Sequence, residues 1–204
     1  MKNNLPNSCK VVVIGGGVAG CSTAYHLAKF GWKDTVLLER DVITSGTTWH
    51  AAGLIGQLGS SATITKLRNY SLNLYKQLEK ETGLSTGLKQ NGSLTVATTH
   101  DRLEELKRQV TFAQRFDIEA KEVNKEEIKA IYPLINVDDI VGGVFIARDG
   151  QADPVGVANV LAKAARQNGA QIIEKCPVKK ILKKDNKIVG VETSKGKIEC
   201  EYVV

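Results

Sequence analysis

Three glycines near the N-terminus have the spacing of a turn that binds a diphosphate. Gly15, Gly17 and Gly20 form the pattern G-x-G-x-x-G, and Glu39 follows Gly20 by nineteen residues. The first glycine permits a tight turn, the second lets the backbone approach a pyrophosphate, and the third lets a helix and a strand pack closely. An acidic residue at this distance can accept hydrogen bonds from ribose hydroxyl groups. The spacing therefore predicts a dinucleotide site.

The segments around the glycines predict a β-α-β unit that would position them. Residues 10–14, K-V-V-V-I, have the composition of a buried parallel strand, and residues 35–39, T-V-L-L-E, indicate a second one. Residues 18–30 place their apolar side chains on one face of a helix. The N–H groups of Val18 and Ala19 would then lie at the helix start, where they can donate to phosphate oxygens.

A second segment, S-G-T-T-W-H-A-A-G at residues 45–53, offers hydroxyl groups and bare backbone without helical or strand periodicity. It favours FAD over NAD, because it supplies the second contact to phosphate and flavin that an ordinary crossover in an NAD domain lacks. Ala24, Leu27 and Gly31 extend the glycine fingerprint as in the long β-α-β pattern of flavin proteins, which also favours FAD. An NAD(P)-dependent dehydrogenase stays an alternative. The candidate residues in this segment are Ser45, Gly46, Thr47, Thr48, His50, Ala51, Ala52 and Gly53.

Residues 44–53, T-S-G-T-T-W-H-A-A-G, resemble the N-terminal region of the sarcosine and dimethylglycine dehydrogenases, within the D-amino-acid-oxidase-like flavoprotein superfamily. Residues 90–94, Q-N-G-S-L, residues 132–139, Y-P-L-I-N-V-D-D, and residues 149–154, D-G-Q-A-D-P, look like the same family. The first two of these, together with residues 169–178, look nearer to the sarcosine dehydrogenases. The resemblance covers nearly the whole chain.

The resemblance implies a site for FAD that is bonded covalently through His50, with Val178 presenting backbone groups to the adenine. Two readings stay open for Val178 and for Arg40. Val178 could be an ordinary buried strand residue, and Arg40 could lie near the adenosine or be an ordinary surface charge.

The resemblance also implies oxidation of an N-methyl amine, such as sarcosine or dimethylglycine, by hydride transfer to flavin N5. An electron-transfer flavoprotein would be the partner, and tetrahydrofolate is expected only in a longer chain. Residues that bind the substrate carboxylate are expected beyond Val204, so no catalytic residue is named. An oxidase that uses oxygen and a non-catalytic regulatory protein that keeps the flavin fold stay open.

Asp149 and Asp153 could form an acid/base pair. A turn for Asp149 and an N-cap for Asp153, followed by Pro154 at the first helical position, explain them better.

The expected fold is α/β: a Rossmann-type FAD-binding domain, discontinuous over residues 1–90 and 148–204, with an inserted α+β substrate domain that starts at 91–147. Residues 45–59 are expected to be a loop or broken turn, and residues 202–204 to start a new strand, which indicates a truncated chain. A helix over residues 64–78 should turn Ile64, Leu67, Leu74 and Leu78 inward. Further helices are expected at 103–113, 126–131 and 154–169, and strands at 93–97, 143–147, 172–174, 178–182, 188–192 and 197–200.

Composition excludes several classes of protein. The net charge of +6 comes from 28 Lys and Arg against 22 Asp and Glu, interleaved along the chain without an arginine run. This pattern argues against nucleic-acid binding. The four cysteines contain no C-x-x-C pair, so a metal site is not expected. The polar residues 1–10 lack a signal or transit peptide pattern, and no apolar run could span a bilayer. A cytoplasmic location is expected by default.

Overall fold

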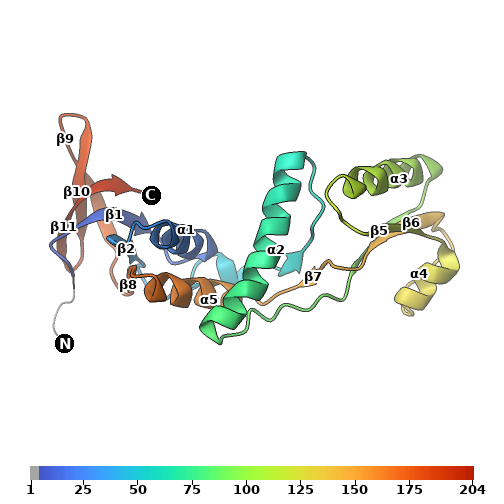
Figure 1. Ribbon diagram of the computed structural model, residues 1–204, viewed down its shortest axis with the longest axis horizontal. Coiled ribbons are helices and arrows are strands. Elements are labelled where there is room, and N and C mark those ends of the chain that lie inside the picture. The colour runs from blue at the N-terminus through green and yellow to red at the C-terminus, as the bar shows by residue number, and fades with distance from the viewer. Residues whose placement is uncertain (1–4) are drawn as a thin grey trace. The chain divides into compact units, whose positions relative to one another are not determined.

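The computed structural model describes residues 5–204, and the chain forms two compact units (Figure 1). Residues 1–4, part of the polar N-terminus and of the first predicted domain, lie outside the described residues. Residues 53–76, assigned above to the flavin-binding domain, cluster with the second unit, and the predicted domain boundaries stay a prediction. Unit 1 comprises Met1–Ala52, Gln77–Gly87 and Asp153–Val204, and unit 2 comprises Gly53–Lys76 and Leu88–Ala152.

Unit 1 is built on a six-stranded mixed sheet with the strand order β8-β2-β1-β11-β10-β9. The central strand β1 pairs in parallel with β2 on one side and with β11 on the other, and β2 pairs in parallel with β8. The predicted α/β class is therefore confirmed. The strands are β1 (Ser8–Ile14), β2 (Thr35–Leu38), β8 (Gln171–Ile173), β9 (Val178–Lys184), β10 (Lys187–Thr193) and β11 (Gly196–Val203).

Two helices of unit 1, α1 (Val18–Lys29) and α5 (Pro154–Gln167), pack against each other. Figure 1 shows them side by side next to the strands, and α1 also contacts β1 and β2. Helix α1 ends at Lys29 with Phe30 as its C-cap, and the next residue, Gly31, has a φ of 92° and donates its N–H to the carbonyl oxygen of Ala28. The predicted helix and its glycine stop are confirmed.

Helix α5 begins with Asp153 as its N-cap. The Asp153 carboxylate accepts the backbone N–H groups of Val155 and Gly156, both at 3.0 Å, and Pro154 occupies the first turn. Each bond satisfies a donor that has no partner within the helix. The N-cap role is thus confirmed over the acid/base reading for Asp153.

Replacing Asp153 with alanine is expected to lower the free energy of unfolding by about 1 kcal/mol, the usual cost of losing an N-cap. Urea unfolding followed by circular dichroism measures the change. Asp139→Ala is the control, because Asp139 is exposed in the loop before β6 and caps no helix. Equal stability of the two variants would contradict the capping role.

The C-terminal residues continue a strand and do not start one, so the prediction for residues 202–204 is wrong. Tyr202 and Val203 end β11, where they lie opposite Val11 and Val12 of β1. The first part of β11 pairs with β10 in a hairpin, and the strand then continues alongside β1. Residues 202–204 are apolar because the end of this one strand lies beside β1 rather than beside β10.

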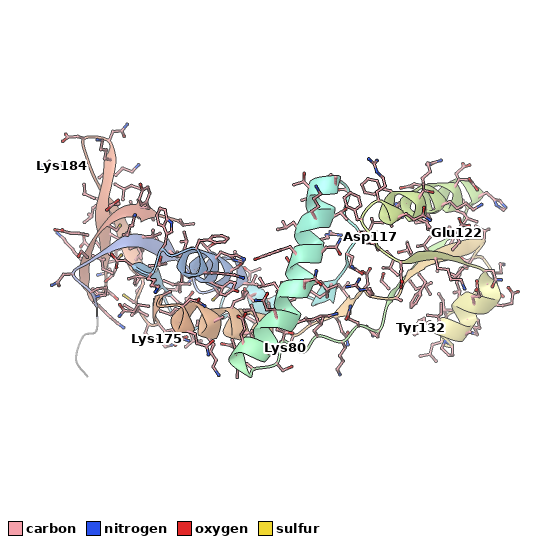
Figure 2. The ribbon with its side chains drawn as sticks, in the orientation of Figure 1. Lys80, Asp117, Glu122, Tyr132, Lys175 and Lys184 are labelled. Atoms are coloured by element: carbon pink, nitrogen blue, oxygen red, sulfur yellow. The ribbon has the colours of Figure 1, made fainter. Side chains whose placement is uncertain are left out.

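The β9–β10 hairpin carries much of the basic charge of unit 1. Its turn is formed by Asp185 and Asn186, both with positive φ, as a two-residue hairpin turn requires. Figure 2 shows Lys184 projecting from the tip. Because β9 is an edge strand, its exposed lysines oppose pairing with a strand of another molecule.

Unit 2 contains a three-stranded antiparallel sheet with the order β4-β6-β5, and a two-stranded sheet, β3-β7. Strand β5 was not predicted, because Lys121 and Glu122 interrupt its apolar pattern. The strands are β3 (Leu54–Ile55), β4 (Ser93–Ala97), β5 (Ala120–Val123), β6 (Gly142–Ile146) and β7 (Gly150–Gln151); the helices besides α2 are α3 (His100–Gln114) and α4 (Lys125–Ile131).

Two expectations for residues 45–82 are corrected. The predicted loop or broken turn contains a 3₁₀ turn, η1 (Thr48–His50), and also strand β3, which was not predicted. Helix α2 (Ala62–Thr82) buries Leu74 and Leu78 as expected, but Ile64 is 38% and Leu67 58% exposed. Thr65 takes the buried position in the first turns of α2, where its hydroxyl group donates to the carbonyl oxygen of Ser61 at 2.8 Å.

Within residues 5–204, no helix combines the length and the apolar character needed to cross a bilayer.

Candidate functional site

A hollow of about 630 Å³ lies in unit 1 where β1 and β2 end. In open α/β sheets, ligands bind beyond the carboxyl ends of parallel strands. Sequence reasoning missed three of the lining residues, Ile14, Leu38 and Pro177, although the ends of the two predicted strands could have indicated the first two. The lining comprises Ile14, Gly15, Gly17, Val18, Ala19, Leu38, Glu39, Arg40, Gly46, Thr47, Thr48, Ala51, Pro177 and Val178.

The backbone angle constrains the first glycine of the turn, and the available space constrains the last. Gly15 has a φ of 111°, and its N–H donates to the carbonyl oxygen of Leu38 at 2.9 Å. A Cβ atom on Gly20 would lie 1.9 Å from the carbonyl oxygen of Gly15. Gly20 does not line the hollow; its missing side chain lets the helix start approach the turn.

The N-terminus of α1 faces the hollow through Gly17, Val18 and Ala19. Gly17 is the N-cap and has no side chain to satisfy the helix, and the first turn contains no acidic residue. The Val18 N–H donates to the Thr48 hydroxyl oxygen, so a diphosphate would be bound by the positive end of the helix dipole and by the other N–H groups of the first turn.

Glu39 is buried beneath the turn, with an exposed fraction of 7%. Its Oε2 atom accepts the N–H of Gly16 at 2.6 Å, and its Oε1 atom accepts the N–H of Asp41 at 2.8 Å. Sequence reasoning missed this role in holding the turn. Each carboxylate oxygen keeps a second lone pair, so Glu39 can also accept ribose hydroxyl groups.

The second segment is fixed to the glycine turn by two hydrogen bonds. The N–H of Thr44 donates to the carbonyl oxygen of Gly16, and the N–H of Val18 donates to the Thr48 hydroxyl oxygen, both at 3.0 Å. Thr48 is buried, while Thr47 is exposed and lines the hollow beside it. The two motifs found in the sequence thus form one site.

His50 ends η1 and has an exposed side chain. Thr48, which begins η1, and Ala51, which follows His50 directly, line the hollow, whereas His50 itself is not a lining residue. The imidazole stacks on the Trp49 indole with the ring centroids 3.8 Å apart. Besides His50 and Gly20, the candidate residues that do not line the hollow are Ser45, Ala52 and Gly53.

The thiols of Cys9 and Cys21 are buried and stay protonated. The Cys21 thiol donates to the carbonyl oxygen of Gly16, and burial raises the pKa of Cys21 to about 12. Burial likewise raises the pKa of Cys9 to about 12, so neither thiol forms a thiolate near neutral pH. Among the described residues, no group of three or more His, Cys, Asp or Glu side chains could hold a metal ion.

Unit 2 has a second hollow, of about 960 Å³, beside the buried Asp149. Asp149 accepts the Gln57 N–H at 2.8 Å and the Ser93 hydroxyl group at 2.6 Å. These bonds hold the loop after β3 against β4. The Oε1 atom of Gln57 is buried and has no hydrogen-bond partner among the residues that the structure describes.

Comparisons with known proteins agree with this geometry. Residues 10–204 match the DAO family, described as FAD dependent oxidoreductase. The chain is 45% identical to human mitochondrial sarcosine dehydrogenase, over 98% of this chain and 22% of that protein. It is 42% identical to the mouse mitochondrial pyruvate dehydrogenase phosphatase regulatory subunit, over 98% of this chain and 23% of that protein. The resemblance to sarcosine and dimethylglycine dehydrogenases is confirmed.

The fold is similar to that of a solved L-proline dehydrogenase from P. horikoshii, with a TM-score of 0.90 and 32% sequence identity. This similarity covers 98% of the chain and 52% of the solved chain. The chain therefore spans about a quarter or less of the curated relatives named above and about half of this solved structure.

The expected cytoplasmic location is wrong, because the two curated relatives named above and the dimethylglycine dehydrogenase of rat are mitochondrial proteins. The expectation rested on the lack of a leader pattern in residues 1–10 and on four unpaired thiols. Neither feature carries positive information about a compartment.

Proposed function

Because the chain belongs to the family of FAD dependent oxidoreductases, we propose that it binds FAD in the hollow of unit 1 and contributes to the oxidation of an N-methyl amine such as sarcosine. The observation that carries this proposal is the joining of the glycine turn and residues 44–53 into one hollow by the Thr44 and Thr48 hydrogen bonds. The similarity to sarcosine dehydrogenase supplies the substrate class.

The residues around the hollow fit the parts of FAD. The N-terminus of α1, which has glycine as its N-cap and no acidic residue in its first turn, suits the diphosphate, and the carboxylate of Glu39 suits ribose hydroxyl groups. The same negative charge disfavours a nucleotide with a 2′-phosphate. Pro177, Val178 and Arg40 would lie on the adenosine side, since they line the hollow with Glu39. When bound, FAD supplies an acceptor for hydride at N5.

We further propose that His50 bonds the flavin covalently. Support comes from the position of His50 in η1, between residues that line the hollow. A covalent bond would prevent dissociation of the flavin. The same proposal includes three further molecules. The amine is the substrate, an electron-transfer flavoprotein accepts the electrons, and tetrahydrofolate binds only in a longer chain.

A regulatory protein that keeps the flavin fold is the second candidate. The 42% identity to a phosphatase regulatory subunit is nearly as high as the identity to sarcosine dehydrogenase. Turnover separates the two functions. Reduction of an artificial electron acceptor should depend on sarcosine or dimethylglycine if the chain belongs to an enzyme, and the ratio of the two rates identifies the substrate. A flavin-loaded protein that oxidises neither amine would favour the regulatory function.

Acid denaturation of the protein purified with its flavin tests the site. We expect a yellow pellet, because a covalent flavin stays with the precipitated chain. In His50→Gln the colour should move entirely to the supernatant. His100→Gln is the control, because His100 begins α3 in unit 2. Colour in neither fraction of the wild-type protein would contradict FAD binding, and a yellow pellet from His50→Gln would exclude His50 as the attachment residue.

A further inference from the structure

We propose that Trp49 is a positioning residue that holds the imidazole of His50 for its attachment to the flavin. The inference rests on the proposed function, because it needs a flavin in the hollow of unit 1. The proposed FAD site, as described through the glycine turn, Glu39 and Thr48, gives this exposed tryptophan no role, and the present inference assigns it one.

The two rings form a close stack. Their centroids lie 3.8 Å apart and their planes are inclined by 34°. This distance is short for an aromatic pair, which usually has centroids 4.5–7 Å apart. The indole therefore restricts the imidazole to a small set of orientations.

The backbone beneath the stack is fixed as well. The N–H of His50 donates to the carbonyl oxygen of Thr47 at 3.1 Å. The N–H of Ala51 donates to the carbonyl oxygen of Thr48 at 3.2 Å. The Thr48 hydroxyl oxygen in turn accepts the N–H of Val18, the first residue of α1. The base of the stack is thus tied to the turn proposed to bind the diphosphate.

His50 needs such a restraint, because no residue within 5–204 forms a hydrogen bond with its ring. The side chain is exposed, and an exposed histidine samples several rotamers. Trp49 is itself 56% exposed, and its stack on His50 is its only aromatic contact among the described residues. Stacking restrains one face of the imidazole and leaves the ring edge, with both nitrogen atoms, uncovered by the indole.

An uncovered edge is what the attachment requires. A ring nitrogen of His50 provides the electron pair of the new bond to the flavin 8α carbon. The N–H proton and one C–H proton are released, and the two remaining electrons pass to dioxygen, which becomes hydrogen peroxide. The in-plane lone pair must point at the carbon for this reaction, so a misoriented imidazole would slow the attachment without weakening FAD binding.

The test measures the rate of covalent attachment after FAD is added to the flavin-free protein, as flavin fluorescence that stays with the denatured chain on a gel. At saturating FAD, Trp49→Ala should attach flavin about fivefold more slowly than the wild type, the loss expected for an aromatic pair. Trp49→Phe should fall between them, because it keeps a smaller ring. The dissociation constant of FAD, measured separately from initial binding, should change less than about twofold.

Trp32→Phe is the matched control, because Trp32 is the other tryptophan and lies near Lys10 and Tyr202. Its attachment rate should equal that of the wild type. Near-UV circular dichroism of the flavin-free protein gives a second readout: His50→Leu should weaken the indole signal in the Trp32→Phe background.

Each alternative result has a different meaning. Equal attachment rates in Trp49→Ala, Trp49→Phe and the wild type would overturn the role of Trp49 and leave the proposed function intact. Wild-type flavin that is bound but never attached would overturn both the role of Trp49 and the attachment at His50. No bound flavin at all would overturn the proposed function itself.

Discussion

Gly20→Ala is expected to destabilise unit 1 by about 3 kcal/mol or more and to weaken FAD binding by at least about a hundredfold. The added Cβ atom would lie 1.9 Å from the carbonyl oxygen of Gly15, and this oxygen belongs to backbone that cannot rotate away as a side chain would. Relief requires the turn and the start of α1 to separate. That movement displaces Gly17 and Val18 from the hollow.

Thermal unfolding and titration with FAD measure the two effects on the same variant. Gly56→Ala in unit 2 is the control for the same chemical change. Its added Cβ atom would have its nearest neighbours at 3.7 and 3.9 Å, which is ordinary van der Waals contact. Unchanged stability and affinity in Gly20→Ala would show that the glycine spacing does not set the geometry of the site.

The parts of the fold that the sequence predicts well are those in which local signals agree. Residues 11–14 are β-branched and apolar, Gly17 and Gly31 flank a helical pattern, and the structure has β1 and α1 at these places. Likewise, Asp153 and Pro154 combine an N-cap with a favoured first-turn residue, and α5 begins there. Agreement between propensity, periodicity and capping leaves few alternatives.

The errors arise where long-range contacts decide. The residues from Tyr202 onward have the composition of a new strand, but their pairing with β1 is set by a partner about 190 residues away in the chain. Leu67 has the helical spacing of a core residue, yet it is exposed because Thr65 fills the buried position nearby. Neither pairing nor the choice of buried face is encoded in local periodicity alone.

The candidate site follows the same division. The glycines and Glu39 were identified from spacing, since each performs a backbone-level task that few residue types can do. The bond from Val18 to Thr48 was not foreseen, because it joins segments 30 residues apart. The lining residue Pro177 was missed because its place in the hollow depends on which distant segment lies beside β2, and β8 takes that place.

Glu39→Gln is expected to lower the free energy of unfolding by about 2 kcal/mol and to weaken FAD binding about tenfold. The carboxylate accepts two backbone N–H groups with its two oxygens, and an amide can accept only one of them. The backbone N–H of either Gly16 or Asp41 would then face the NH₂ group of the glutamine and would have no acceptor. Because Glu39 is only 7% exposed, water cannot readily replace the lost acceptor.

The loss of affinity has a separate cause. A neutral amide is a weaker acceptor for ribose hydroxyl groups than a carboxylate, and a loosened Gly16 moves the turn at the diphosphate. Urea unfolding without FAD isolates the first effect, and titration with FAD well below the urea midpoint isolates the second. Glu201→Gln is the control, since Glu201 is exposed on β11 and should change the free energy of unfolding by less than about 0.5 kcal/mol. If Glu39→Gln is as stable as this control but binds FAD weakly, Glu39 acts on the ribose alone; if it is unstable but binds FAD normally, its role is confined to holding the turn.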